Sequence, residues 1–280
     1  MPRKIHVNDI IKTVEELCIK ACVVVPCDIR RFMEGAVEKE EGLGKQILQD
    51  MLKNQDIAIA DNLPICQDTG MVVVFVTIGQ DVQIEGGSLG DAINQGVRDG
   101  YEKGLLRKSV VADPINRVNT KDNTPAVIHY NIVEGDGFHI TVSPKGFGSE
   151  NMSRLKMLVP SDGIEGVKKF IIETVVAADA NACPPIVVGV GVGGSFEKSA
   201  IMAKEALMKP LDAHHPDPFW HNIEKELLAE INNLGIGPAG LGGRLTAMAV
   251  HINTYATHIA GLPLAVNIGC HVNRHEEASL

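Results

Sequence analysis

The chain has 280 residues, of which 45% are hydrophobic and 22% are charged, and its formal net charge is -9. This composition predicts a folded protein with a sizeable core and excludes a disordered chain. The acidic balance argues against a surface that binds nucleic acid. No long apolar stretch suggests a signal peptide or a membrane span. We therefore expect a cytoplasmic protein with one domain over residues 1–280.

Apolar residues at helical spacing predict a first helix that Asn8 caps, with Ile10, Val14 and Leu17 on one face. The further helices expected in chain order are 28–40, 43–61, 89–103 capped by Ser88, one capped by Ser161 that ends at Ala180, one capped by Ser195 that ends at Met208, and 219–233. The expected strands are 71–78, 127–133, 138–142, 186–192, 245–253 and 264–268.

Strands 127–133 and 138–142, joined by a turn rich in glycine, predict a β-hairpin. The pattern as a whole predicts an α+β fold. In it, a helical N-terminal segment and further helices pack around a mixed or antiparallel β-sheet.

Two patterns that suggest a cofactor have a simpler structural interpretation. The glycines from Gly189 to Gly194 resemble a dinucleotide-binding loop, but the acidic residue expected about 20 residues later at a strand end is missing. We interpret them as glycines that let a strand and a helix pack closely. Cys18, Cys22 and Cys27 match no common metal-ligand spacing, and we expect them to be small buried hydrophobic residues.

A zinc site built from cysteines and histidines is disfavoured, because no close CxxC or HxxxH pair anchors one. The histidines considered as ligands are His214, His215, His251, His258, His271 and His275. Most of them are expected on the surface or as hydrogen-bonded core residues.

Three other cysteines lie in loops beside apolar strands, at Cys66, Cys183 and Cys270. Such loops present functional side chains on a rigid scaffold. Three thiols without a fourth partner suit an iron–sulfur cluster with one iron free, whereas three unrelated buried cysteines are the alternative. Gln67 and Asp68 favour the cluster, because a site for a hydroxy acid needs a carboxyl group and hydrogen-bonding groups.

Four motifs together resemble the α subunit of the two-subunit, iron–sulfur class I fumarate hydratases and of the related L-tartrate dehydratases. They are ICQDTG at 65–70, KGFGSEN at 145–151, ACPP at 182–185 and the Gly269-Cys270 pair. The resemblance runs from the first helix to Cys270. It implies a 4Fe-4S cluster, a hydro-lyase reaction on a small dicarboxylate, and a separate β subunit in an α2β2 heterotetramer.

The resemblance also implies roles for individual residues. Cys66, Cys183 and Cys270 hold the cluster, whose free iron binds the hydroxyl and one carboxylate of the substrate. Asp68 is an active-site acid or orients the hydroxyl, and His258 is a second catalytic group that acts across a subunit interface. The substrate-binding residues implied are Gln67, Arg107, Gly146, Gly148 and Ser149.

The expected reaction is the reversible hydration of fumarate to L-malate in the tricarboxylic acid cycle, with the β subunit supplying further basic residues and the base. Dehydration of L(+)-tartrate is the alternative, because the two substrates differ by one hydroxyl and no residue here discriminates between them. A non-enzymatic iron–sulfur redox sensor is a third interpretation. Such a sensor would have no use for Arg107 or for the loop from Gly146 to Ser149.

Overall fold

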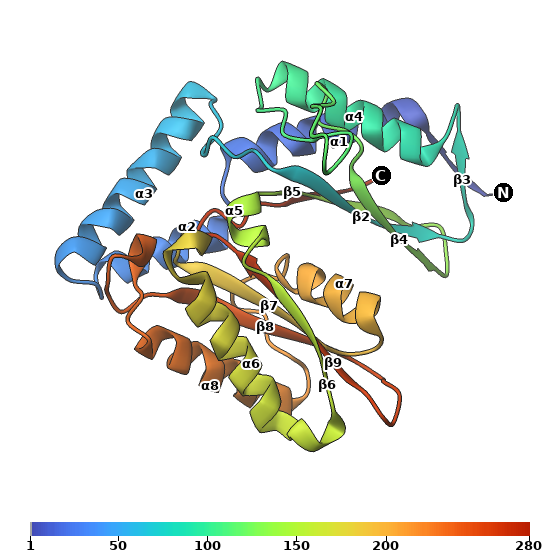
Figure 1. Cartoon of the computed structure of the whole chain (residues 1–280). Coiled ribbons are helices and arrows are strands. Elements are labelled where there is room, and N and C mark those ends of the chain that lie inside the picture. The colour runs from blue at the N-terminus through green and yellow to red at the C-terminus, as the bar shows by residue number, and fades with distance from the viewer. Residues whose placement is uncertain (1) are drawn as a thin grey trace. The chain divides into compact units, whose positions relative to one another are not determined.

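The computed structural model describes residues 2–280, which form two compact units (Figure 1). Unit 1 comprises the described residues up to Pro26, Asn54–Phe147 and Arg274–Leu280; unit 2 comprises Cys27–Lys53 and Gly148–Asn273. Each unit has its own buried apolar cluster and a mixed sheet, which confirms the α+β fold class. This division does not test the expectation of one domain, which stays a prediction.

Unit 1 is built on a four-stranded sheet and a separate strand pair. Its strands are β1 (Arg3–His6), β2 (Met71–Gly79), β3 (Val82–Glu85), β4 (Val127–Val133), β5 (Phe138–Lys145) and β10 (Glu276–Ser279), and its helices are α1 (Val7–Val23) and α4 (Leu89–Lys103). The large sheet has the order β10-β5-β2-β4, and β1 pairs with β3 in parallel. The apolar run of β2 therefore occupies a central position, as expected for a buried strand.

Helix α1 packs against β5 and β10, and α4 packs against α1. Gly96 makes the close approach of the two helices possible, because a Cβ there would lie 2.6 Å from the carbonyl oxygen of Ile11. Cys18 and Cys22 are buried in this core, as predicted. The expected cap of α1 is wrong, since the His6 side chain is the cap and accepts a hydrogen bond from the N–H of Asn8.

The predicted hairpin of 127–133 and 138–142 is wrong. Strand β2 lies between β4 and β5, parallel to the former and antiparallel to the latter. The glycine-rich turn crosses the end of β2 instead, where the N–H of Gly79 donates a 2.7 Å hydrogen bond to Gly137. A strand as apolar as β2, with Val72, Val74 and Val76 buried, gains more from the central position than a hairpin would gain from its tight turn.

Unit 2 is a sheet with helices on both faces. Its strands are β6 (Arg154–Leu158), β7 (Ile186–Gly193), β8 (Ala247–Tyr255) and β9 (Leu262–Gly269). The helices that lie wholly in unit 2 are α2 (Cys27–Val37), α6 (Gly163–Ala178), α7 (Phe196–Ala206) and α8 (Pro218–Asn233). Helices α3 (Gly42–Asp61) and α5 (Phe147–Glu150) belong to it for most of their length. Short 3-10 turns occur at Pro160–Asp162, Asp179–Ala182 and Pro238–Gly240. The strand order is β6-β9-β7-β8.

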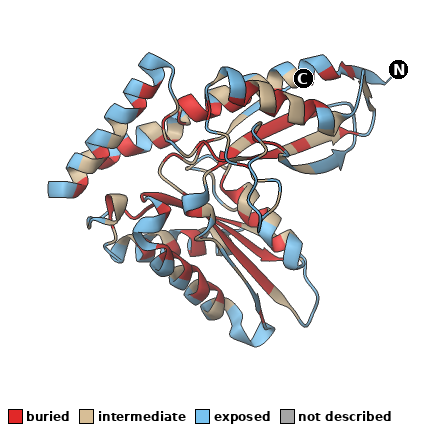
Figure 2. Ribbon diagram, turned by 45° about the horizontal axis from the view of Figure 1, so that its top comes forward, coloured by how far each residue is buried: buried red, intermediate tan, exposed pale blue. Residues whose placement is uncertain are grey.

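Helix α7 contacts β7 and β9, while α8 contacts β8 and α6. Figure 1 shows α7 on one face of this sheet and α6 with α8 on the other. Figure 2 shows that buried residues are concentrated on the strands, and every residue of β7 is buried. Two glycines of β7 confirm the close-packing interpretation: a Cβ on Gly189 or Gly191 would lie 2.2 or 2.1 Å from a carbonyl oxygen of α7.

Three expectations for unit 2 need correction. Cys27 is exposed at the start of α2 and is not a buried hydrophobic residue. Ser161 lies inside a 3-10 turn, so α6 begins only at Gly163. Ser195 precedes α7, but its hydroxyl donates to Glu197 and caps no backbone N–H. None of the helices within residues 2–280 combines the length and apolar character that a membrane crossing requires.

Candidate active site

The Cys66 loop connects α3 to β2 within unit 1 and is anchored at both ends. The N–H of Ile65 donates to the carbonyl of Cys22 at 2.9 Å, and Asn54 donates to the carbonyl of Ile65 at 2.9 Å. At the other end, Gly70 has a φ of 78° and lies so close to Lys145 that a Cβ would stand 2.7 Å from its backbone. Only glycine fits there without strain. The Cys66 side chain lies between these anchors, partly exposed.

Asp68 is the most highly connected side chain of this loop. Its Oδ1 accepts a 3.0 Å hydrogen bond from the N–H of Gly70, and its Oδ2 accepts a 2.8 Å hydrogen bond from the N–H of Phe147. The buried guanidinium of Arg274 donates to the backbone carbonyl of Asp68 and, at 3.0 Å, to that of Pro144. The carboxylate is thereby fixed next to the KGFGSEN motif at 145–151, here called the glycine loop. Each of its oxygens retains a lone pair for another donor.

Arg107 and Gly146 lie beside this loop in unit 1. The hydroxyl of Thr69 donates to the backbone carbonyl of Arg107 at 2.8 Å, while the Arg107 side chain is exposed. A Cβ on Gly146 would lie 3.2 Å from Oδ2 of Asp68, so the two residues are in contact. Unit 1 thus brings together five predicted site residues: Cys66, Gln67, Asp68, Arg107 and Gly146.

Cys183 and Cys270 lie at the same end of the unit 2 sheet, beside its two inner strands. Cys183 precedes β7 and Cys270 follows β9, and these antiparallel strands pair Val187 with Gly269. The N–H of His271 donates to the carbonyl of Cys183 at 3.1 Å, which ties the two loops together. Cys183 is exposed and has left-handed backbone angles, with φ 54° and ψ 64°.

The rest of the glycine loop lies close to the same end of the unit 2 sheet. Gly148 is next to the Cys183 loop, since a Cβ there would stand 3.6 Å from the carbonyl oxygen of Asn181. Glu150 is held by Lys204 at 2.6 Å and by Asn267 at 2.9 Å. Because Asn267 is part of β9, these bonds attach the loop to the strand that leads to Cys270. Ser149 is buried within the segment so anchored.

His258 is not near Cys183 and Cys270 within unit 2. It lies in the loop after β8, at the sheet end where Gly193 pairs with Tyr255. At about 3.3 Å per residue, the eight residues of β7 put roughly 25 Å between the two ends of the sheet. A His258 side chain that acts near Cys183 and Cys270 would therefore have to belong to another copy of the chain.

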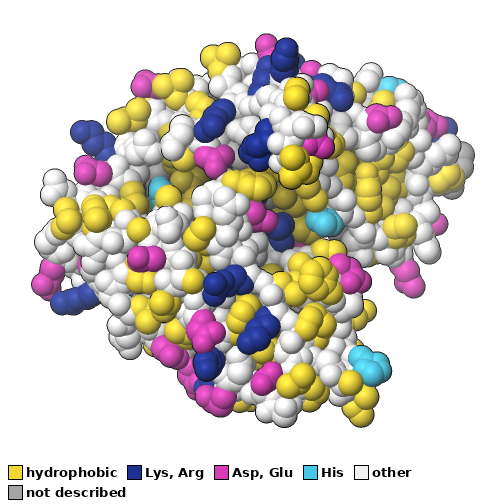
Figure 3. Space-filling model, in the orientation of Figure 1, with side chains coloured by type: hydrophobic (Ala, Val, Ile, Leu, Met, Phe, Trp, Pro, Cys, Tyr) yellow, Lys and Arg dark blue, Asp and Glu magenta, His cyan; other side chains and the backbone are white. Residues whose placement is uncertain are grey.

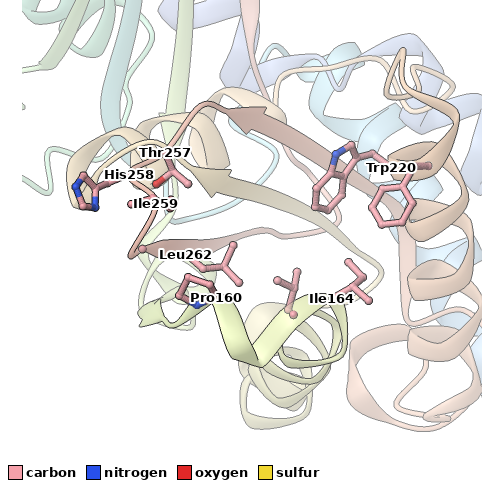
Figure 4. Close-up of a pocket in the computed structure, with 11 residues that line it drawn as sticks. Pro160, Ile164, Trp220, Thr257, His258, Ile259 and Leu262 are labelled. Atoms are coloured by element: carbon pink, nitrogen blue, oxygen red, sulfur yellow. The ribbon is translucent and has the colours of Figure 1, made fainter.

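His258 also borders a pocket of about 410 Å³ that is lined mainly by apolar side chains. Figure 4 shows His258 at one end of this pocket and Trp220 at the other, with Leu262 and Ile164 between them. The ring is exposed, and its Nδ1 accepts a 3.2 Å hydrogen bond from the N–H of Ala260.

Exposure separates the cysteines into two classes. Burial raises the pKa of the Cys22 thiol to about 11 and that of Cys18 well above its usual value, so both stay protonated. Both lie in the apolar core of unit 1, as expected of structural cysteines. Cys66, Cys183 and Cys270 are exposed or partly exposed. Their side chains therefore fit the donor set that a cluster with three thiolate ligands requires.

Some charged groups on unit 2 form ion pairs with one another. Figure 3 shows basic and acidic side chains interspersed over α6 and α8. Lys168 of α6, for example, lies 3.1 Å from Glu165 and 3.4 Å from Glu226. Arg107 of unit 1 is the cation that the sequence motifs assign to the substrate, and its side chain is exposed.

Several residues that support the site were missed by the sequence reasoning. Arg274, Asn267 and Lys204 carry no signal in the sequence, because their partners are far away in the chain. Asn123 is a fourth such residue: it is fully buried, accepts from the N–H of Ser109 and donates to the carbonyl of Gly70. A buried arginine or asparagine next to a functional loop is recognised only once its contacts are known.

Comparison with known proteins places these residues in a family context. Residues 11–279 match the family model described as fumarate hydratase (Fumerase). A protein of Methanocaldococcus jannaschii, provisionally named L(+)-tartrate dehydratase subunit alpha, is 41% identical over 93% of this chain and 94% of its own length. The L(+)-tartrate dehydratase α subunits of Escherichia coli and Shigella sonnei are 35% identical over 96% of this chain and 89% of theirs.

Proposed function

The chain belongs to the fumarate hydratase (Fumerase) family of hydro-lyases, and from that membership we propose that it is the cluster-bearing α subunit of an L(+)-tartrate dehydratase. The observation that carries this proposal is the set of relatives named as tartrate dehydratase α subunits, which match almost the whole chain. These names favour tartrate over the fumarate expected from the motifs. L(+)-tartrate, the alternative substrate in the sequence analysis, is therefore the first candidate.

Hydration of fumarate to L-malate is the second candidate. It is supported by the description of the matching family model, which names fumarate hydratase. Both reactions remove or add water across a four-carbon dicarboxylate, so they need the same kind of site.

We propose that Cys66, Cys183 and Cys270 hold a 4Fe-4S cluster. When bound, such a cluster supplies an iron without a protein ligand, a Lewis acid for the substrate hydroxyl. The burial of Cys18 and Cys22 in the apolar core of unit 1 supports this choice, and Cys27 lies outside the family motifs that carry the other three cysteines.

The chain's own residues would bind and orient the substrate. Arg107 is exposed and can grip a carboxylate with two parallel hydrogen bonds. This positive charge opposes the charge that builds up on the carboxylate when the adjacent carbon loses its proton. Asp68 is fixed by two backbone N–H groups, so it can orient a substrate hydroxyl or a water molecule. Gln67, Gly148 and Ser149 would add hydrogen bonds.

Further basic groups and the base would come from a β subunit, because Arg107 is the single cation that the motif pattern assigns to the substrate. The names of the relatives as α subunits imply such a partner. His258 would act on the site of a second α chain, which agrees with an α2β2 assembly. That stoichiometry and a cytoplasmic location remain part of the proposal.

Anaerobic co-expression with the β subunit tests the substrate. The purified complex is assayed on both tartrate enantiomers, on fumarate and on L-malate. We expect kcat/KM to be highest for L(+)-tartrate. A higher value for fumarate and malate would replace the first candidate with the second, and no turnover of any of the four by a cluster-loaded complex would overturn both. The α chain alone serves as the control and should be inactive.

A further inference from the structure

Three side chains of unit 2 that play no part in the candidate active site bring metal-ligating atoms together. His214 lies in the loop before α8, and His221 and Glu224 lie one turn apart on that helix. One ligand atom of each lies within 4.8 Å of the other two. The two imidazole rings are 4.3 Å apart between centroids, at an interplanar angle of 68°. Two imidazoles and a carboxylate thus converge on one point.

The His221 ring is short of a partner. Its Nδ1 is buried and forms no hydrogen bond with the described residues. The same atom lies 3.9 Å from Oε2 of Glu224, too far for a hydrogen bond. A nitrogen and an oxygen bound to one tetrahedral zinc ion stand about 3.3 Å apart, given bonds of about 2.0–2.1 Å. A small side-chain movement would therefore let an ion bridge them.

Glu224 is positioned as ligating carboxylates are. Its side chain is 3% exposed, Oε1 accepts a 2.7 Å hydrogen bond from the N–H of Ile252, and Oε2 accepts a 3.0 Å hydrogen bond from the N–H of His215. Outer hydrogen bonds of this kind fix the direction of a metal ligand. Lys209 attracts Glu224 only at longer range, since its ammonium donates to the carbonyl of Ile252 at 3.4 Å. A buried carboxylate of this kind is stabilised by a cation at close range.

The neighbouring His215 is already committed to other contacts. Its Nε2 lies 3.2 Å from the hydroxyl of Thr254, and its Nδ1 accepts a 3.0 Å hydrogen bond from the N–H of Asp217. The loop therefore holds one histidine in the protein network and leaves the adjacent one, His214, exposed beside His221.

The donor set selects the class of cation. Calcium and magnesium prefer oxygen ligands, whereas two histidines and one carboxylate are a common set for zinc that leaves a fourth position for water. His214 is exposed and His221 partly exposed, which gives an ion a route from solvent. We propose that His214, His221 and Glu224 form a Zn²⁺ site that fastens the loop before α8 to that helix, separate from the proposed cluster.

Zinc titration of the full chain, stripped of metal and followed by calorimetry, tests the site. A combined Cys66→Ser, Cys183→Ser and Cys270→Ser variant is titrated in parallel, because the cysteine thiols could also take up zinc. We expect one Zn²⁺ per chain to bind in this cysteine variant. His214→Asn or His221→Asn, introduced into it, should weaken that binding at least about 100-fold, since loss of outer partners alone costs about 10–100-fold.

Cobalt gives a second measurement that needs no histidine variant. Co²⁺ bound to the wild-type chain at this site should show the visible absorption bands of nitrogen and oxygen coordination. Any Co²⁺ bound by the cysteines is recognised separately by its thiolate charge-transfer bands. His139→Asn is the matched control for the zinc titration, because His139 also faces a glutamate, with Nε2 at 3.3 Å from Glu277, but no third His, Cys, Asp or Glu within residues 2–280 completes a site there. It should bind zinc as the parent does. The site would be overturned if the cysteine variant bound no zinc, or if the His214 and His221 variants bound zinc as tightly as their cysteine-variant parent.

Discussion

The N–H of His271 donates a 3.1 Å hydrogen bond to the carbonyl oxygen of Cys183, so the residue that follows Cys270 is attached directly to the other cysteine of unit 2. The bond uses backbone atoms alone. Replacing either thiol should leave the loops in place, which allows the role of each sulfur to be tested without loss of the fold.

We expect Cys183→Ser to abolish cluster assembly, because two thiolates are too few to hold four irons at the proposed site. The measurement is iron and sulfide content after anaerobic reconstitution, with circular dichroism to confirm the fold. Cys27→Ser is the control, since Cys27 is also an exposed thiol of unit 2, and it should retain the full cluster. An undiminished cluster in the Cys183→Ser chain would contradict the ligand assignment.

Arg107→Ala should lower kcat/KM of the αβ complex at least about ten-fold, equal to about 1.4 kcal/mol, while the cluster spectrum stays unchanged. Arg107→Lys should recover little, because an ammonium cannot reproduce the two-pronged contact. Lys108→Ala is the control: Lys108 is the adjacent cation, but its ammonium is paired with Glu102. Near-normal kinetics of both Arg107 variants would move the carboxylate contact to the β subunit.

Glu40 and Glu41 provide a matched pair for the stability of unit 2. The buried Glu40 accepts from the N–H groups of Arg244 at 2.6 Å and Leu245 at 2.5 Å. Glu40→Ala leaves a buried N–H without a partner and should lower the free energy of unfolding by about 1–3 kcal/mol. Glu41→Ala removes only an exposed ion pair with Arg244, worth at most about 1 kcal/mol. Urea unfolding measures both, and equal effects would contradict the difference in burial.

Two glycines of unit 2 should respond to alanine in opposite directions. A Cβ on Gly191 would lie 2.1 Å from the carbonyl oxygen of Ser199, so Gly191→Ala forces α7 away from β7 and should destabilise by about 1–3 kcal/mol or more. Gly35 is exposed inside α2 with nothing within 4 Å of a Cβ. Gly35→Ala should stabilise by up to about 1 kcal/mol through helix propensity. Thermal unfolding under anaerobic conditions reports both shifts.

The strongly apolar elements of the fold could be predicted from the sequence. The continuous apolar runs of β2, β7 and β9 identify buried strands, because their side chains have no solvent-facing alternative. Strands β1, β3, β6 and β10 were missed, since they are short and carry polar residues such as those of Glu276–Ser279. Their strand conformation depends on the partner strand and not on local preference.

The site shows the same limit. The motifs around Cys66 and Cys183 predicted loops beside strands, as found. Arg274 could not be assigned, because it acts on Asp68, 206 residues earlier in the chain. His221 and Glu224 were likewise overlooked: their spacing on one helix suggests a pair, but the third member, His214, reaches them only through the course of its loop.

Strand β10 and Arg274 belong to unit 1 although unit 2 intervenes between them and the rest of that unit. During synthesis, residues 27–53 and 148–273 leave the ribosome before the segment that completes the first sheet. Unit 1 therefore lacks its edge strand, and the guanidinium that holds the Asp68 backbone, until synthesis is nearly complete. The backbone of the Cys66 loop is therefore held in its final position only once the last residues of the chain have been made.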